Sequence, residues 1–275
     1  MKKITLFISL VVSLAFFVTG CGGNAATTAK NDAAPAQTVL KVGATAVPHA
    51  EILNFVKPLL AKEGVDLQIV EFSDYVQPNM ALADKELDAN YFQHIPYLEK
   101  FSTEHNLPLT YTVAVHIEPM GLYSKKVKAV NDIAAGSEIG IPNDPTNTGR
   151  ALALLEKAGL IKLQAGAGIK ATIGDITENP KNFKFRELEA AQLPRSLDDL
   201  AAAVINTNYA LEANLNPTQD ALIIEAKDSP YANVLAIRQG DEKRPEIQKL
   251  SKILNSPEVK KFIEDKYKGA IVPAF

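Results

Sequence analysis

The sequence has few of the residues on which disulfide scaffolds and many enzyme sites depend: one cysteine, four histidines and no tryptophan among 275 residues. A single cysteine excludes a disulfide within the chain, so the stability of the folded body must come from its hydrophobic core. The short motifs of two hydrolase classes, GxSxG and HExxH, are also absent. Together these absences argue against a hydrolytic enzyme.

An excess of positive charge is missing as well. After Lys2 and Lys3 the chain holds 27 basic and 32 acidic residues, a net charge of −5. No basic stripe with interleaved aromatic residues occurs, which argues against a nucleic-acid partner. Beyond residue 20 no apolar run approaches the roughly 20 residues that span a bilayer.

The N-terminus carries a short apolar run, ITLFISLVVSLAFFVT, directly after Lys2 and Lys3. This pattern is typical of a signal peptide, predicted here as residues 1–20. The run ends in VTGC, which resembles the bacterial lipobox and implies cleavage before Cys21 and acylation of its thiol. The alternative is a buried structural cysteine in an N-terminal helix. More than one acyl chain on Cys21 would anchor the protein stably to the outer side of the cell membrane.

The lipidated cysteine and the residues up to 38 form a predicted tether. The stretch GGNAATTAKNDAAPAQT contains no aromatic and no large aliphatic residue, so it cannot join a core. The folded body then begins at Val39 and comprises 237 residues, a length that suits one or two domains.

Strand and helix patterns alternate along this body, which favours an α/β fold with helices on both faces of mixed sheets. TVLKVGAT (38–45) reads as a strand and is followed by an amphipathic helix that Gly64 closes. Two long extended stretches, 109–124 and 231–238, could each carry the chain between two bodies. We therefore predict a two-lobed clamshell, with lobe 1 formed by 39–122 plus 232–275 and lobe 2 by 123–231.

The stretch IGIPNDPTNTGRALALLEKAGL predicts an anion site at a helix start. Thr146 or Asn147 can cap the helix, and free backbone N–H groups there would face the ligand. Arg150, in the first turn, would grip a carboxylate through two parallel hydrogen bonds. The alternative is that Arg150 pairs with a surface glutamate while Asn147 only caps.

A second polar candidate is Asn206, at the end of the apolar strand in AVINTNYA. Ligands of open α/β sheets bind beyond the carboxyl ends of the strands. The side-chain amide offers an acceptor for an amino group and a donor for a carboxylate. An asparagine that merely closes a turn is the alternative.

His94 lies in the aromatic stretch NYFQHIPYLEKF. No nucleophile or orienting carboxylate accompanies it, so no catalytic residue is predicted. A metal site of His94, His116 and Glu118 is conceivable, but no tight ligand spacing supports it, and we expect neither metal nor cofactor.

The aromatic residues around His94 predict a pocket wall instead. Tyr91, Phe92 and His94 would form it at the end of a strand, together with Tyr75 from the end of a neighbouring strand. The plainer alternative is that Phe92 and Tyr97 are ordinary core residues.

Several stretches together resemble the methionine-binding lipoprotein family of ABC importers, the NlpA or MetQ type: KVGAT, FSDYVQPNMALADKELDANYFQHIPYLE, GLYSKK, IPNDPTNTGRALALLEKAGLIKL, ENPKNFKFRELEAAQLPRSLDDLAAAVINTNYA and DSPYANVLAIR. They cover about residues 40 to 240. The resemblance implies a type II periplasmic-binding-protein fold and a non-enzymatic, monomeric carrier. Such a carrier closes on L-methionine and delivers it to a membrane permease driven by an ATPase.

The resemblance also implies roles for individual residues. The side chain of the ligand would be surrounded by Tyr75, Tyr91, Phe92 and His94. Asn147 and Arg150 would bind its carboxylate, and Asn206 its amino group and carboxylate. The chain departs from the family pattern at Asn208, a position where a threonine is equally expected, so the resemblance assigns no role to Asn208.

Physical chemistry agrees with methionine as the ligand, because a thioether favours contacts with aromatic edges, worth about 0.3–1.5 kcal/mol each. The alternatives are D-methionine, methionine sulfoxide or a methionine-containing dipeptide in the same fold, or a surface adhesin or antigen lipoprotein.

The lipobox gives a first test. We expect Cys21→Ser to release the protein from membranes, because the acylated thiol is its only predicted anchor. Fractionation of cells into membrane and soluble protein measures this. Continued sedimentation of the variant with membranes would show that the lipobox interpretation is wrong.

Overall fold

The computed structural model describes residues 37–275. The predicted signal peptide (1–20), Cys21 and the tether up to residue 36 lie outside the described residues. Within residues 37–275, no helix is both long enough and apolar enough to cross a bilayer.

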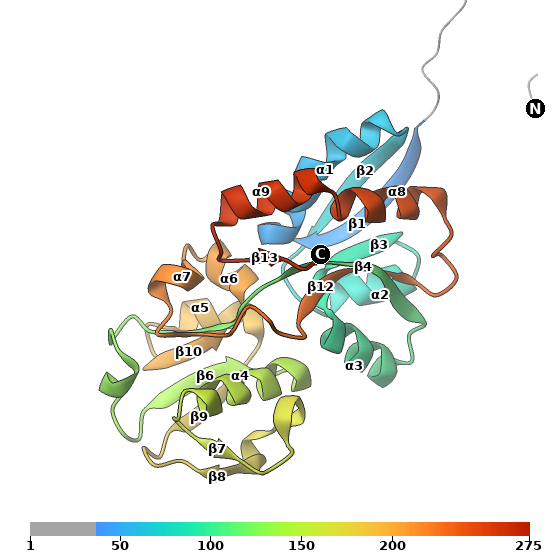
Figure 1. The fold of residues 1–275 in the computed structure, drawn as a ribbon. Helices are drawn as coiled ribbons and strands as arrows, with labels where there is room; N and C mark the ends of the chain where they lie inside the picture. Colours follow the sequence, from blue (N-terminus) through green and yellow to red (C-terminus); the bar gives the residue numbers. More distant parts are fainter. Residues whose placement is uncertain (1–36) are drawn as a thin grey trace, which may run out of the picture. The chain divides into compact units, whose positions relative to one another are not determined.

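The first sheet is built from both ends of the described chain (Figure 1). Its strands, in spatial order, are β13 (Val272–Pro273), β4 (Leu109–Ile117), β12 (Ala232–Arg238), β3 (Ala89–His94), β1 (Thr38–Thr45) and β2 (Val65–Phe72). β1 pairs in parallel with β2 and β3, whereas β12 runs antiparallel to both β3 and β4. The strand predicted at 38–45 is confirmed as β1.

The second sheet comes from the middle of the chain. Its strands, in spatial order, are β11 (Ile223–Ile224), β5 (Gly121–Tyr123), β10 (Ala202–Ile205), β6 (Glu138–Pro142) and β9 (Lys184–Leu188). A separate two-stranded hairpin pairs β7 (Lys162–Leu163) with β8 (Ile176–Glu178). Both larger sheets mix parallel and antiparallel pairs, so the predicted α/β class with two mixed sheets is confirmed.

Helices flank these sheets. Their bounds are α1 (Glu51–Lys62), α2 (Gln77–Ala83), α3 (Ile95–His105), α4 (Pro145–Lys157), α5 (Leu193–Ser196), α6 (Thr207–Glu212), α7 (Pro217–Asp220), α8 (Pro245–Leu254) and α9 (Pro257–Tyr267). Shorter turns are η1 (Ala46–Ala50), η2 (Val130–Asp132), η3 (Gly168–Lys170), η4 (Ile173–Asp175) and η5 (Ala190–Gln192).

Each sheet has its own core. In the first, Leu40 and Val42 of β1 are fully buried while Lys41 between them is exposed, and α1, α8 and α9 supply further buried apolar residues. In the second, β6 and β10 pack against the apolar face of α4. Two separately filled cores are what two bodies joined by chain crossings require.

The chain crosses between the sheets twice. It leaves β4 and enters β5 through 118–120, and it returns from β11 to β12 through 225–231. The two crossings run side by side, since Glu225 N donates to Met120 O at 2.8 Å (Figure 1). The predicted crossing within 109–124 is therefore confirmed. The stretch 231–238 was expected to carry the chain back, but the return crossing precedes it, and β12 lies within the first sheet. β5 spans the predicted lobe boundary at residue 122 and pairs within the second sheet.

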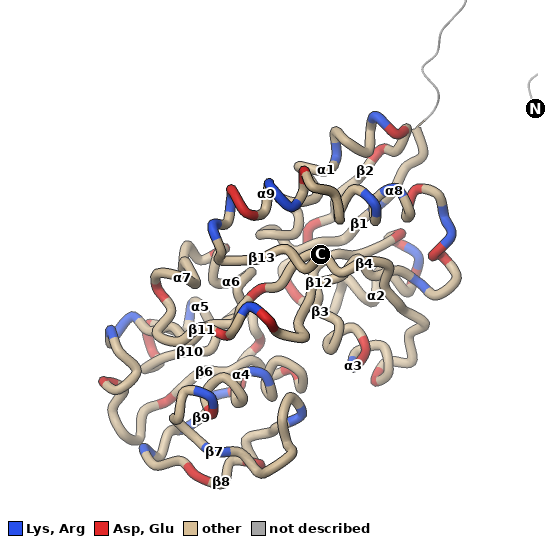
Figure 2. Tube along the Cα trace, viewed as in Figure 1, with Lys and Arg blue, Asp and Glu red and all other residues tan. Residues whose placement is uncertain are grey.

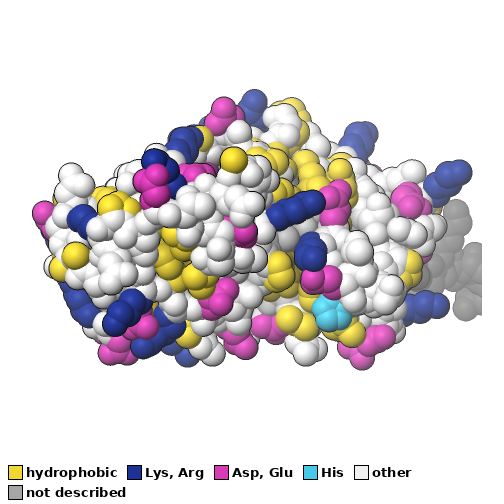
Figure 3. Space-filling view, turned by 90° about the horizontal axis from the view of Figure 1, so that it is seen from below, with side chains coloured by type: hydrophobic (Ala, Val, Ile, Leu, Met, Phe, Trp, Pro, Cys, Tyr) yellow, Lys and Arg dark blue, Asp and Glu magenta, His cyan; other side chains and the backbone are white. Residues whose placement is uncertain are grey.

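Charges of both signs are spread over the outer surface. On α9, acidic and basic residues follow one another (Figure 2), and Lys266 forms an ion pair with Glu51 of α1 at 3.0 Å. The face drawn in Figure 3 also shows lysine and arginine side chains interspersed with acidic ones. Exposed pairs of this kind contribute little to stability, about 0–1 kcal/mol.

Gly149 of α4 gives a test of the packing in the second body. A Cβ on Gly149 would lie 2.2 Å from the backbone oxygen of Ile169 in η3, so the two segments would have to move apart. We expect Gly149→Ala to lower the free energy of unfolding by about 1–3 kcal/mol, despite the higher helix propensity of alanine.

Urea unfolding of the two variants Gly149→Ala and Gly174→Ala measures this effect. Gly174 is the matched control, because the nearest atom to its Cβ would be Thr172 Oγ1 at 3.6 Å. An unfolding midpoint for Gly149→Ala equal to that of the control would contradict the packing argument.

Candidate functional site

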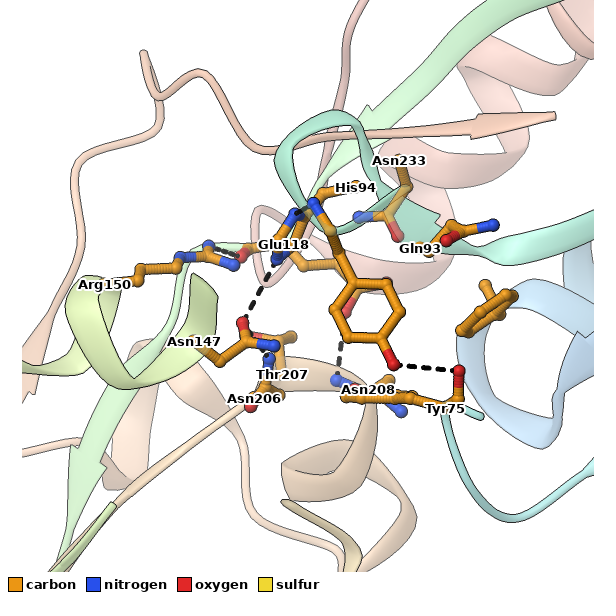
Figure 4. A pocket seen from close by; sticks show the side chains of 12 residues that line it. Tyr75, Gln93, His94, Glu118, Asn147, Arg150, Asn206, Thr207, Asn208 and Asn233 are labelled. Atoms are coloured by element: carbon orange, nitrogen blue, oxygen red, sulfur yellow. Dashed lines mark hydrogen bonds between the residues drawn. The ribbon is translucent and has the colours of Figure 1, made fainter. Parts of the chain in front are cut away.

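One cavity collects polar and aromatic side chains from the first sheet, the second sheet and the crossing between them (Figure 4). Its lining residues are Tyr75, Phe92, Gln93, His94, Tyr97, Glu118, Asn147, Arg150, Asn206, Thr207, Asn208 and Asn233. Of the predicted site residues, the structure brings together all except Tyr91.

The start of α4 differs from the sequence prediction. Asp144, rather than Thr146 or Asn147, caps the helix, because its Oδ1 accepts from Asn147 N at 3.0 Å. Pro145 occupies the first helical position, which suits its missing N–H and fixed φ. The backbone N–H of Asn147 is therefore already satisfied by a carboxylate of the chain and is not free for an outside anion.

The capping geometry also fixes the side chain of Asn147. Its Nδ2 donates to both carboxylate oxygens of Asp144, at 3.0 and 2.8 Å. Its Oδ1 is therefore left for the cavity side, where it accepts from Asn206 Nδ2 at 3.0 Å and lies 3.1 Å from His94 Nε2. Asn147 thus links α4 to β3 across the cavity.

Arg150 is buried in the cavity wall, with 3% of its surface exposed. Its Nε and Nη2 donate to the two carboxylate oxygens of Glu225, at 3.0 and 2.5 Å. Nη2 also donates to the backbone oxygen of Glu118 at 2.7 Å. The expected two-bond grip thus exists, but its partner is Glu225. The alternative in the sequence analysis was that Arg150 pairs with a surface glutamate. The partner is indeed a glutamate, but the pair is largely buried, and Arg150 still lines the cavity.

His94 ends β3 and caps α3. Its Nδ1 accepts from the backbone N–H of Tyr97 at 3.1 Å, so the ring proton is on Nε2, which donates to Asn147 Oδ1. Burial, together with the positive charge of Arg150, lowers the pKa of His94 to about 3. The ring is therefore neutral at physiological pH and serves as a wall and a hydrogen-bond donor.

Three aromatic rings form the other end of the cavity. Tyr75 lies 5.9 Å from Phe92 and 5.7 Å from Tyr97, and Phe92 lies 6.1 Å from Tyr97, measured between ring centroids. The hydroxyls are held by Tyr75 O–H donating to Asn208 Oδ1 at 2.6 Å and Tyr97 O–H donating to the backbone oxygen of Tyr75 at 3.0 Å. Phe92 and Tyr97, for which a core role was the alternative, are buried and also line the cavity.

Tyr91 requires a correction. The sequence analysis placed it in the pocket wall, but it is fully buried in the core of the first sheet and does not line the cavity. Its hydroxyl hydrogen-bonds His116 Nδ1. Tyr91 therefore lies behind the wall and supports His116.

Glu118 reaches the cavity with two buried histidines behind it. His116 Nε2 lies 2.8 Å and His49 Nε2 lies 3.2 Å from Glu118 Oε1, while Glu118 Oε2 accepts from Asn208 N at 3.1 Å. Burial lowers the pKa of His116 to about 3 and that of His49 to about 4, and burial raises the pKa of Glu118. The metal set considered from the sequence contained His94. The structure places His49 beside His116 and Glu118 instead, with ligating atoms within 4.8 Å of one another.

Two buried amide atoms at the cavity have no hydrogen-bond partner among the described residues: Asn206 Oδ1 and Asn208 Nδ2. The first is an acceptor and the second a donor. Buried polar atoms are rarely left unpaired, so each of these atoms is suited to a polar group of a ligand.

Sequence reasoning did not assign six of the lining residues to the site: Gln93, Tyr97, Glu118, Thr207, Asn208 and Asn233. Asn208 had a local signal, because it lies two residues after Asn206, in the first turn of α6. Asn233 had none, since it reaches the cavity by pairing opposite His94 and His116 in the antiparallel first sheet.

Comparison with known protein families identifies the family of this chain. The model of the NlpA lipoprotein family matches residues 40–275. The chain belongs to the NlpA lipoprotein family.

Relatives within the NlpA family share most of their length with the chain. It is 42% identical to the methionine-binding lipoprotein MetQ of Bacillus subtilis, over 99% of both chains. It is 44% identical to the D-methionine-binding lipoprotein MetQ of Escherichia coli K12, over 77% of this chain and 79% of the other. A solved nutrient-binding protein of Burkholderia cenocepacia, bound to methionine, is 49% identical with a TM-score of 0.84, over 86% of this chain and 100% of the other.

The buried histidines predict a loss of stability in mild acid. The unfolded state takes up protons below a histidine pKa of about 6.5, whereas the native state resists protonation of His49, His94 and His116 down to about pH 3–4. Stability is therefore fully present above about pH 6.5. Each histidine removes up to about 1.4 kcal/mol per pH unit below it.

Urea unfolding of the ligand-free protein between pH 7.5 and 5 measures this slope. We expect His94→Gln to lose about 1 kcal/mol less than wild type between pH 6 and 5, because one of the three proton-resisting rings is gone. A variant with the wild-type slope would show that His94 is not held neutral in the native state.

Proposed function

We propose that this protein is an extracytoplasmic substrate-binding lipoprotein that binds L-methionine and delivers it to an ABC importer. The names of its relatives support a methionine ligand, since the B. subtilis relative is named methionine-binding and the B. cenocepacia structure is bound to methionine. The observation that carries the proposal is a single cavity with a charged, amide-lined end and an aromatic end (Figure 4).

The charged end suits the zwitterion of an amino acid. Arg150 offers the N–H groups of Nη1 to a carboxylate, while the carboxylate of Glu118 and the free Oδ1 of Asn206 face an ammonium group. Hydrogen bonds to charged groups contribute about 1.5–3 kcal/mol each when their partners are buried. This end therefore selects for free amino acids.

The aromatic end suits a thioether side chain. Tyr75, Phe92 and Tyr97 offer ring edges and faces within one cluster. Burial of a methionine side chain contributes about 1.5–3 kcal/mol, and sulfur–aromatic contacts add about 0.3–1.5 kcal/mol each. The wall thus distinguishes methionine from polar amino acids, and the sulfur contacts distinguish it from an all-carbon chain of equal length.

In this proposal the chain acts from the membrane surface as a monomer. Acylated Cys21 anchors it, residues 22–37 serve as the tether, and the lobe around the first sheet closes with the lobe around the second sheet over the ligand. The closed form hands methionine to a permease whose ATPase drives import. The paired crossings at 118–120 and 225–231 supply the segments about which such closure takes place.

We also propose that the chain has no catalytic role. The lining residues include no serine, cysteine or lysine, and the hydroxyl of Thr207 donates to the backbone oxygen of Pro119. His94, the one histidine in the lining, uses both ring nitrogens for hydrogen bonds within the chain. A serine, cysteine or lysine nucleophile is therefore missing from the cavity wall, and the carboxylate of Glu118 is engaged by Asn208, His49 and His116.

D-methionine is the second candidate ligand, because the E. coli relative is named D-methionine-binding. The free donor Asn208 Nδ2 would also suit an acceptor on a ligand, such as a sulfoxide oxygen. Titration with both enantiomers and with methionine sulfoxide separates these ligands from L-methionine.

Isothermal titration of unfolded and refolded, ligand-stripped protein against the twenty amino acids tests the proposal. We expect L-methionine to bind most tightly, and norleucine, which lacks only the sulfur, to bind about 2- to 12-fold more weakly. We expect Arg150→Ala to weaken L-methionine binding by about 10- to 100-fold, because the carboxylate loses a charged donor.

Arg186→Ala is the matched control for Arg150→Ala. It also removes an arginine from an ion pair with a glutamate, Glu138, but both side chains are more than one third exposed and lie outside the cavity. The absence of heat with L-methionine for refolded wild type would refute the proposed ligand. Equal affinities of Arg150→Ala and Arg186→Ala would refute the role of Arg150.

A further inference from the structure

The guanidinium of Arg150 has most of its donors committed within the chain. Of its five N–H groups, the one on Nε and the two on Nη2 donate to Glu225 and to the backbone oxygen of Glu118. The two on Nη1 have no hydrogen-bond partner among the described residues. Because Arg150 lines the cavity, these two are the donors available to a bound carboxylate.

Glu225, in turn, is held by the neighbouring crossing. It follows β11 directly, its backbone N–H donates to Met120 O at 2.8 Å, and its Oε2 accepts from Met120 N at 3.3 Å. Its side chain is only 15% exposed. The carboxylate that faces Arg150 is therefore fixed by the backbone of both crossings rather than by a flexible surface loop alone.

An aromatic ring covers one flat face of the guanidinium. The ring of Tyr231, at the end of the return crossing, has its centroid 4.0 Å from Arg150 Cζ. A planar guanidinium held on two edges by hydrogen bonds and on one face by an aromatic ring has little freedom to rotate. Arg150 is thus oriented before any ligand arrives.

We infer that Glu225 is a positioning residue for ligand recognition: it occupies the two-bond edge of Arg150 and thereby presents only Nη1 to the carboxylate of the ligand. This inference rests on the proposed function and deepens it. The ligand carboxylate meets Arg150 end-on, and the geometry of this contact is set by a residue that does not line the cavity.

Two effects of Glu225 on carboxylate binding oppose each other. Its negative charge weakens the attraction of Arg150 for a second carboxylate, whereas its two hydrogen bonds fix the donor in place. A buried guanidinium that loses its partner turns toward whatever acceptor remains, here the oxygens of Glu118, and leaves the ligand position. We therefore expect the positioning effect to exceed the charge effect.

The test compares Glu225→Gln with wild type for two ligands, L-methionine and L-methioninol, which replaces the carboxylate by a hydroxymethyl group. We expect Glu225→Gln to weaken L-methionine about tenfold or more and to change methioninol less than about twofold. A merely structural role would weaken both ligands alike. Glu138→Gln is the matched control, because it removes the charge of an exposed glutamate that pairs with Arg186 outside the cavity.

A second measurement does not need a ligand. In spectra of ¹⁵N-arginine-labelled protein, with Arg150→Lys used for assignment, we expect the Nε–H signal of Arg150 to be protected from exchange in wild type and to lose that protection in Glu225→Gln. If Glu225→Gln fails to fold, Glu225→Asp serves in its place, because its shorter side chain keeps the charge but draws the carboxylate away from Nε and Nη2, and the same selective loss of methionine affinity is expected.

The outcomes separate the inference from the proposed function. If wild type binds methionine but the Glu225→Gln or substitute variant keeps or raises that affinity, or weakens both ligands equally, the positioning role is overturned while the function stands. If wild type binds no methionine, the function fails, and the exchange measurement alone decides whether Glu225 orients Arg150.

Discussion

A buried guanidinium must have acceptors, and Arg150 takes its acceptors from both crossings between the two sheets. Glu225 belongs to the return crossing and Glu118 to the outgoing one, and the crossings are themselves joined by a backbone hydrogen bond from Glu225 N to Met120 O. Breaking such a buried pair would leave an uncompensated charge, which is far more costly than losing an exposed ion pair. The charged end of the cavity is therefore built into the connection between the sheets.

Burial is the main reason why the histidines near the cavity are uncharged. For His94 the positive charge of Arg150 adds to the effect of burial, so the ring stays neutral and acts as a donor. His49 and His116 stay neutral behind Glu118 and direct their ring nitrogens at its carboxylate. Because both histidines are neutral, they do not cancel the negative charge of Glu118. The charge that remains on this carboxylate suits the ammonium group of an amino acid.

The aromatic end differs in kind, because shape and polarizability rather than charge govern it. Tyr75, Phe92 and Tyr97 come from segments around β2, β3 and α3, and hydrogen bonds from the tyrosine hydroxyls keep the rings in place. A wall of fixed rings loses little conformational freedom when a flexible thioether chain enters it. In the proposed function, selection among amino acids takes place at this end, and selection for amino acids at the other.

The sequence by itself determined the α/β class, the outgoing crossing and half of the residues that line the cavity, because strand alternation, helix periodicity and polar residues at strand ends are local patterns. Lobe boundaries and the anchor at Cys21 remain predictions. Only the tertiary structure decided that Tyr91 supports His116 instead of lining the cavity, that Asp144 caps α4, and that Glu225 occupies the fork of Arg150. Each of these depends on pairing or orientation that periodicity does not encode, and the contact between Arg150 and Glu225 joins residues 75 positions apart.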